Sequence, residues 1–341
     1  MKLPFLQNIT VGRSHFIALL CVELFLLFRL CIPFWSNNLQ TWDLMGHYYS
    51  AWFVHEHLFP NITGWNPTFF MGYEQGQFYP PLFSYLAALL GQVLPLESAF
   101  KILVIVGILA TPLSFYVLAR KWDFNPWSAV SITVVMLSLL FIISYETGVN
   151  FYATFNVGNI NHGMSVPFLC FYLAFLPGAL EQKRYLFISL LMTVIVLLHP
   201  FMSIVAAFFF VASVIVVVRA KKTFWTCLKH VGLTFLLSSF WILPFLLFER
   251  TEITPMILLR LSAAEVVVLT VVMTAYAIFE RPHRIFSLRM RKTHVAFWAL
   301  TLLIALLYIV SSFSYFEVPI RYHRFYMIYF LFAPILAFSL L

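Results

Sequence analysis

The sequence predicts an all-α fold, a polytopic bundle of about ten transmembrane helices. Of its 341 residues, 62% are hydrophobic and only 10% are charged, and the mean hydropathy is +0.92. Runs of about 20 apolar residues, long enough to cross a bilayer, recur along the chain. The net charge is +8, and the Lys and Arg residues lie in short clusters between these runs. Clusters at such positions set the orientation of the spans in the membrane, and this distribution argues against nucleic-acid binding.

Ten apolar segments are expected to be membrane helices. They cover residues 15–34, 100–119, 127–144, 163–180, 185–198, 200–218, 230–248, 257–279, 294–315 and 325–341. The 185–198 segment is short and stops at His199–Pro200, which indicates a broken or partial span. Residues 1–341 are expected to form a single integral membrane domain. The chain ends inside its last apolar run, so we expect a truncated C-terminus.

The distribution of basic residues predicts a cytoplasmic N-terminus, because it then places 15 of the 21 on the inner side. These are Lys2, Arg13, Arg120, Lys121, Lys183, Arg184, Arg219, Lys221, Lys222, Lys229, Arg281, Arg284, Arg289, Arg291 and Lys292. The first long loop then lies outside the cell, or in the endoplasmic reticulum lumen of a eukaryote. The scheme requires that residues 82–96 do not cross the membrane. Pro80–Pro81 kinks the entry and the apolar stretch is short, so we expect an outer juxtamembrane or re-entrant helix there.

The first outer loop, residues 35–99, holds the first candidate site. Its stretch TWDLMGHYYSAWFVHEHLF is typical of an amphipathic interfacial helix, capped by Thr41 or Asp43. Asp43 and His47 are four residues apart and share one face of that helix. An acid and an imidazole there could be a base and its orienting partner, or two ligands of a divalent metal. A helix cap and a solvated histidine is the commoner role of an isolated pair.

A second candidate site is MGYEQGQFYPP, which contains Glu74. Its glycines let the backbone approach a ligand closely, and Trp65, Tyr73 and Tyr79 offer stacking surfaces. A carbohydrate or a lipid headgroup would suit these groups. The alternative is an interfacial aromatic belt with a solvent-facing acid.

Three further positions at outer helix ends carry polar groups. His162 lies in NVGNINHGMSVP and His199 precedes Pro200. A lone histidine at a helix end more often makes structural hydrogen bonds there than binds a substrate. Arg321, His323 and Arg324 oppose the positive-inside tendency, which favours binding of an anionic phosphate or, alternatively, headgroup anchoring. Glu23 and Glu265 lie within spans and are the best sign of the alternative function, a transporter or lipid flippase.

Several motifs carry a resemblance to known membrane proteins. They are WDLMGH after the first span, GWNP at residues 64–67 and GYEQGQFYPPLFSYLAALLG, with looser matches at LLHP, residues 197–200, and RYHRF. Together they resemble the GT-C superfamily of membrane glycosyltransferases, and more closely the membrane-protein family related to 6-pyruvoyl-tetrahydropterin synthase. The sequence offers no zinc-binding histidine set of the kind that pterin chemistry uses.

The resemblance implies transfer of a sugar from a polyprenyl-phosphate donor to an acceptor, with an acid of the first outer loop acting as base or metal ligand. Asp43 matches that acid by position, and Glu74 is a weaker second candidate beside His47. The chain lacks a DxD motif, which leaves metal use and acceptor class open. The expected partners are membrane lipid, the lipid-linked donor and the acceptor, without nucleic acid. A non-catalytic membrane subunit of the same fold is a third interpretation.

The resemblance and the polar groups together give one set of site residues. The catalytic candidates are Asp43, His47 and Glu74, and the substrate-binding candidates are Tyr73, Tyr79, His162, His199, Arg321, His323 and Arg324.

Overall fold

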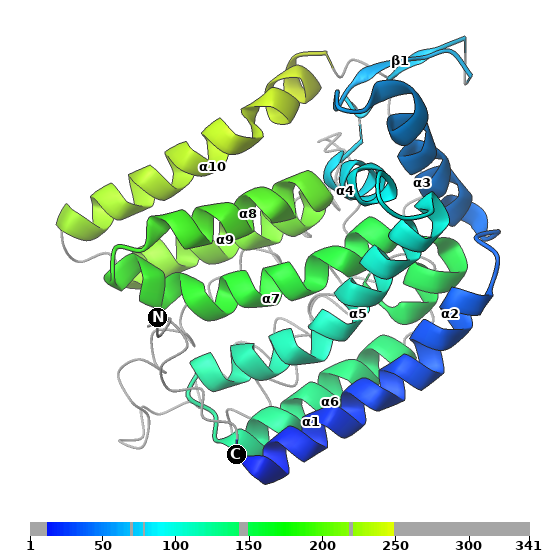
Figure 1. Cartoon of the computed structure of the whole chain (residues 1–341). Coiled ribbons are helices and arrows are strands. Elements are labelled where there is room, and N and C mark those ends of the chain that lie inside the picture. Colours follow the sequence, from blue (N-terminus) through cyan, green and yellow to red (C-terminus); the bar gives the residue numbers. More distant parts are fainter. Residues whose placement is uncertain (1–11, 69–70, 78, 143–148, 218–220, 249–341) are drawn as a thin grey trace, which may run out of the picture.

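The computed structural model describes residues 12–68, 71–77, 79–142, 149–217 and 221–248, and this part of the chain is almost entirely helical (Figure 1). Its helices are α1 (Arg13–Leu26), α2 (Ile32–Ser36), α3 (Trp42–Phe53), α4 (Leu82–Gly91), α5 (Leu96–Lys121), α6 (Pro126–Ile142), α7 (Ile160–Glu181), α8 (Tyr185–Leu198), α9 (Pro200–Val217) and α10 (Lys221–Phe248). Short π-helical turns are η2 (Leu27–Cys31), η3 (Val54–Leu58) and η4 (Ala153–Val157). The strands β1 (Gly64–Asn66) and β2 (Tyr73–Gln75) form a small antiparallel hairpin. The all-α membrane fold is therefore confirmed.

Four helical segments of the described chain are long and apolar enough to cross a membrane. They are Arg13–Ser36, Leu96–Lys121, Ile160–Glu181 and Thr223–Phe245. Helices α6, α8 and α9 are shorter but equally apolar, and they coincide with the predicted spans at 127–144, 185–198 and 200–218. The last three predicted spans, from residue 257 onward, lie outside the described residues.

Short turns join α5 to α6 and α8 to α9, so the helices of each pair run antiparallel. The Asn125 side chain accepts a hydrogen bond from the Ser128 amide at 2.9 Å. Pro126 begins α6, and its missing N–H costs nothing there because the first amides of a helix have no partner within it. Between α8 and α9 the turn is shorter still, since only His199 separates the two helices, and its backbone is extended. Pro200 then starts α9, so the expected interruption at His199–Pro200 is a tight turn between two helices.

Helix α7 occupies the centre of the bundle. In its most apolar stretch 78% of the residues are buried, against 11% in that of the segment Arg13–Ser36, which contains α1 and lies at the periphery (Figure 1). Three helices meet where His230 of α10 bonds the Tyr172 hydroxyl of α7 and the Ser189 hydroxyl of α8, each at 3.0 Å. Buried hydrogen bonds of this kind tie spans together inside a membrane, where apolar packing alone is weakly specific.

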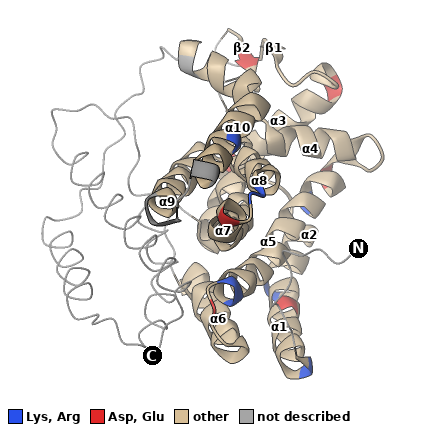
Figure 2. Cartoon of the chain, turned by 90° about the vertical axis from the view of Figure 1, so that its left-hand side faces the viewer, with Lys and Arg blue, Asp and Glu red and all other residues tan. Residues whose placement is uncertain are grey.

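Helix α3, the hairpin and α4 gather at one end of the spans (Figure 1). Helix α4 has ten residues and is about 15 Å long, which is too short to cross the hydrocarbon core. It lies across the spans rather than along them (Figures 1 and 2). We call this end, with α3, α4 and the hairpin, the α3 end, and the opposite end the α10-start end.

Charge differs between the two ends of the bundle. The α10-start end holds the last residues of α5, the α7–α8 turn and the first turns of α10, and with them most of the lysines and arginines of the described spans. Figure 2 shows acidic residues beside the β1–β2 hairpin and a basic one at the free end of α1. The uneven distribution of basic residues along the sequence therefore corresponds to a difference in charge between the two ends of the bundle.

Candidate functional site

Helix α3 presents Asp43 at the α3 end of the bundle. The helix starts at Trp42, with Thr41 as its N-cap residue, but neither expected side-chain cap forms. Instead, the Thr41 hydroxyl donates a hydrogen bond to the carbonyl oxygen of Phe155 at 3.3 Å. Asp43 lies in the first turn, where the helix dipole favours a negative charge. Its side chain is exposed and makes no hydrogen bond or ion pair with any residue that the structure describes.

A second loop packs directly on the start of α3. Gly158, which links η4 to α7, has a left-handed backbone with φ of 100°. A methyl group at this position would lie 2.8 Å from the Asp43 carbonyl carbon, and closer still to the Leu44 amide nitrogen. Only glycine combines this φ with so close an approach. The contact brings the start of α7 beside the residue that carries the candidate acid.

Two histidines from distant parts of the sequence stack at the same end. His162 lies in the first turn of α7, and His199 lies between α8 and α9. Their rings are parallel within 2°, and their centroids are 4.1 Å apart. Both side chains are buried, as is the neighbouring Asn161, whose Oδ1 has no hydrogen-bond partner among the described residues. A buried acceptor of this kind needs a polar partner, which a ligand or water could supply.

His47 does not pair with Asp43 in this arrangement. It is 8% exposed, and its Nε2 lies 3.5 Å from the hydroxyl of Tyr79, whose ring packs against it at 5.4 Å. Burial lowers the pKa of His47 from 6.5 to about 4, because the charged imidazolium is poorly solvated there. His47 is therefore neutral near pH 7.

The hairpin separates Glu74 from a buried polar network. Trp65 and Glu74 are paired across the strands and both are exposed, while Asn66 and Gln75 are buried on the other face. The Asn66 amide donates to the Gln75 side chain at 3.2 Å, and its oxygen accepts from the Tyr49 hydroxyl of α3 at 3.2 Å. The Tyr73 hydroxyl also donates to Gln75. These hydrogen bonds fix the hairpin on α3. Glu74 and Trp65 lie on the opposite, exposed face of the hairpin.

The sequence interpretation missed this network and two other polar contacts. The Gln77 side chain donates to the carbonyl oxygen of Trp241 on α10 at 3.4 Å. Lys101, 6% exposed, donates to the carbonyl oxygen of Trp35 at 2.9 Å and pairs with Glu97 at 2.6 Å. The four-residue spacing of Glu97 and Lys101 was a readable signal. The partners of Asn66 and Gln77 depend on tertiary contacts that no local pattern encodes.

Part of the expected site lies beyond the described chain. Arg321, His323 and Arg324 fall there, as does Glu265. Within the described ranges no group of three or more His, Cys, Asp and Glu side chains could hold a metal ion. The residues that the structure does bring together are Asp43 and the first turn of α7, through Gly158, and His162 with His199.

Comparisons with known proteins identify a family. Residues 76–338 match a family described as a 6-pyruvoyl-tetrahydropterin synthase related domain of membrane proteins. The match begins after Glu74, so Asp43 and His47 precede it. Searches of curated proteins and of solved structures each find no match. Because the match covers more than half of the 341 residues, the chain belongs to this family of membrane proteins.

Proposed function

We propose that this protein is a membrane glycosyltransferase whose acid is Asp43 and whose donor is a polyprenyl-phosphate-linked sugar. The proposal takes the α3 end to be the outer side of the membrane. Sugar transfer then occurs at the boundary between the bilayer and the outer aqueous phase, where a lipid-linked donor presents its head.

The observation that carries the proposal is the exposed, unengaged Asp43 carboxylate beside the start of α7. Asp43 lies in the first turn of α3, shortly after the span Arg13–Ser36, and the Gly158 contact and the Thr41–Phe155 hydrogen bond hold this part of the chain in place. The close backbone support fixes the position of the exposed carboxylate, and a general base needs a fixed position. The buried Asn161 acceptor and the His162–His199 stack add polar groups at the same end of the bundle.

The chemistry requires one base and stabilisation of one leaving group. As an acceptor hydroxyl attacks the anomeric carbon, its oxygen forms the new glycosidic bond and its proton passes to Asp43. The bond between the anomeric carbon and the phosphate oxygen breaks, and the polyprenyl phosphate leaves with the electron pair. Cationic groups would stabilise that charge, and Arg321, His323 and Arg324 are the candidates that the sequence offers. His47, being neutral and held by Tyr79, supports α3 rather than taking the proton.

The proposal is tested by a transfer assay with polyprenyl-phosphate sugars and a lipid-extract acceptor pool. We expect Asp43→Asn to remain folded and membrane-inserted but to lose about 100-fold or more of the transfer rate, because an amide does not accept the proton. Glu56→Gln is the matched control: Glu56 is an exposed acid of the same loop, and its ion pair with His55 is worth little. It should be nearly silent.

Two results of this assay would redirect the proposal. Equal rates for Asp43→Asn and wild type would remove Asp43 as the base. Wild-type protein that transfers no sugar from any polyprenyl-phosphate donor would favour a non-catalytic subunit, or a transporter if it instead moves lipid across the bilayer.

The orientation in the membrane has a separate test. In a variant lacking Cys21, which is exposed, a cysteine at position 56 should react with an impermeant thiol reagent added to intact cells. A cysteine at position 121 should not react. Labelling at 121 from outside would reverse the proposed orientation.

A further inference from the structure

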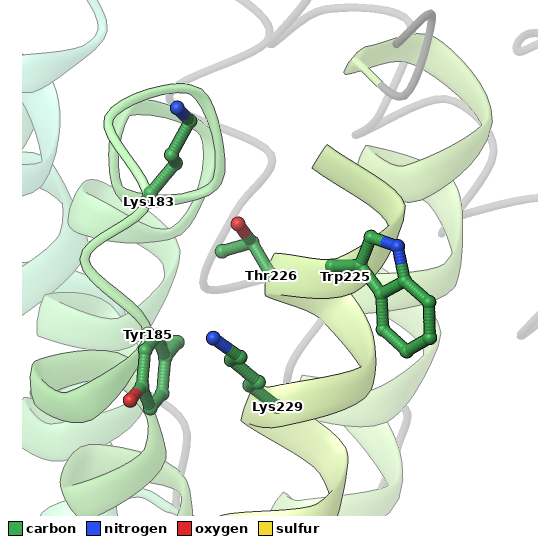
Figure 3. A pocket seen from close by; sticks show the side chains of 5 residues that line it. All are labelled: Lys183, Tyr185, Trp225, Thr226 and Lys229. Atoms are coloured by element: carbon green, nitrogen blue, oxygen red, sulfur yellow. The ribbon is translucent and has the colours of Figure 1, made fainter. Parts of the chain in front are cut away.

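A cleft at the α10-start end of the bundle lies between the α7–α8 turn and the first turns of α10. It is lined by Lys183, Tyr185, Trp225, Thr226 and Lys229, and its volume is about 400 Å³ (Figure 3). That volume is within the range of small-ligand sites. The lining contains two lysines and, among the described residues, no acid.

The two lysines that line the cleft come from different elements. Lys229 extends from α10 toward Tyr185 on the opposite wall, and its ammonium lies 5.6 Å from the centre of the Tyr185 ring (Figure 3). Lys183 comes from the turn after α7, and its ammonium points away from Lys229 in this conformer, while Thr226 is buried on the α10 wall (Figure 3). The ammonium groups of two long, exposed lysines are hydrogen-bond donors that suit the oxygens of a phosphate.

The backbone at Lys183 has a conformation that lysine rarely adopts. Its φ is 59°, in the left-handed region where Gly and Asn are preferred. The turn is closed by a hydrogen bond from the Arg184 amide to the Ala179 carbonyl at 2.9 Å. A lysine therefore occupies this position against its backbone preference, and its side chain lines the cleft.

The residues around the cleft are typical of the lipid headgroup region. Trp225 is 50% exposed and directs its indole outward from α10, as aromatic residues do at the membrane–water interface. Lys229 is exposed one turn further along α10, next to the apolar part of the helix. A ligand in this cleft can keep its acyl chains in the bilayer while its phosphate meets the lysines.

We propose that this cleft binds the phosphate of an anionic membrane lipid in the leaflet that meets the α10-start end. The site is independent of the proposed sugar transfer, because it lies at the opposite end of the bundle from Asp43. Basic pockets between membrane helices on the cytoplasmic side are a recurrent form of lipid recognition.

Lys121 provides a matched control for Lys229. Both residues lie at this end of the bundle and both place their ammonium over an aromatic ring, Lys121 at 5.4 Å from the centre of Phe175. Lys121 does not line the cleft. Its substitution removes the same charge and the same kind of contact without touching the site.

The test measures retention of phosphatidylglycerol by the full chain purified from mixed phosphatidylglycerol–phosphatidylcholine nanodiscs, by native mass spectrometry. Lys229→Gln and Lys183→Asn should each lower retention by about fivefold or more, whereas Lys121→Gln should leave it near wild type. Lys183→Asn suits the left-handed backbone, so the turn is kept while the charge is lost. Thermal melting of each variant checks that the protein stays folded.

Three outcomes would overturn the proposal. An equal fall for all three variants would mean that diffuse surface charge attracts the lipid. Unchanged retention in Lys183→Asn and Lys229→Gln would mean that the cleft binds no lipid phosphate. If inorganic phosphate displaced phosphatidylglycerol completely at millimolar levels, the ligand would be a free phosphate rather than a lipid.

Discussion

The two ends of α7 carry residues with left-handed backbones, and they differ in every other respect. Gly158, two residues before the helix, has φ of 100° and packs against the backbone of Asp43 and Leu44. Lys183, two residues after the helix, has φ of 59° and faces an open cleft with a second lysine. At the first position glycine meets both the conformational and the spatial demand. At position 183 a lysine adopts a backbone conformation that is unfavourable for it and supplies a positive charge.

The contrast separates two kinds of site at the two ends of one bundle. The α3 end is built from tight backbone contacts, stacked or buried histidines and one exposed acid, which suits chemistry that needs a group held in place. The α10-start end is open and basic, and long flexible lysines there can follow a mobile lipid headgroup. Substitutions at Gly158, His47 and Lys183 test this difference between the two ends.

The largest effect is expected at Gly158. Gly158→Ala introduces a methyl group 2.8 Å from the Asp43 carbonyl carbon and an unfavourable φ, so the loop must shift away from α3. We expect a loss of about 2 kcal/mol or more in the free energy of unfolding, measured by melting in detergent. Transfer activity should fall further than stability alone explains.

The control is Gly46→Ala on α3, where a methyl group would meet nothing within 4 Å. It should be neutral or stabilise the helix by up to about 1 kcal/mol. Equal melting temperatures for the Gly158→Ala and Gly46→Ala variants would show that the contact between the second loop and α3 is unimportant.

The next effect is a pH dependence caused by His47. Burial lowers its pKa in the folded protein from 6.5 to about 4, so between these values the unfolded chain binds a proton that the folded protein does not. Stability should therefore fall as the pH is lowered from about 6.5 to about 4, by at most about 3 kcal/mol.

Melting temperatures of wild type and His47→Gln across this range provide the measurement. The gap between the two proteins should narrow or reverse as the pH falls, since glutamine does not titrate. Parallel curves would mean that His47 is solvated or protonated in the folded protein.

The smallest effect is expected at Lys183. Lys183→Asn should raise the free energy of unfolding by a few tenths to about 1 kcal/mol, because asparagine tolerates the left-handed backbone better. Lys121→Gln, at the end of α5, should change it little. A lower melting temperature for Lys183→Asn would indicate that the lysine stabilises the turn itself.

The spans and the site differ in how far the sequence could predict them. Apolar runs located the membrane helices of the described chain, and local composition also predicted the short α4 after Pro80–Pro81. Helix α10 begins at Lys221 rather than at residue 230, because its first turns are polar. Helix α3 was expected from its amphipathic pattern. Asp43 and His47 share a helix as the spacing predicts, but burial joins His47 to Tyr79, 32 residues away, instead of to Asp43. The His162–His199 stack and the Asn66 network likewise join residues that only the folded bundle brings together.

The sequence did not predict that these lysines line a cleft either. In the sequence, Lys183 and Lys229 indicated only the positive charge of an inner segment. Their positions on either side of a cleft depend on how the α7–α8 turn packs against α10, and the left-handed backbone at Lys183 is not encoded by a glycine or asparagine.

The central claim is that the Asp43 carboxylate accepts the proton in sugar transfer, and chemical rescue tests it most directly. Asp43→Ala leaves space for a small carboxylic acid at the start of α3, so the transfer rate, reduced about 100-fold or more, should rise with added formate. Formate should not affect wild type or Glu56→Ala. An Asp43→Ala protein that transfers sugar at the wild-type rate without formate would contradict the claim.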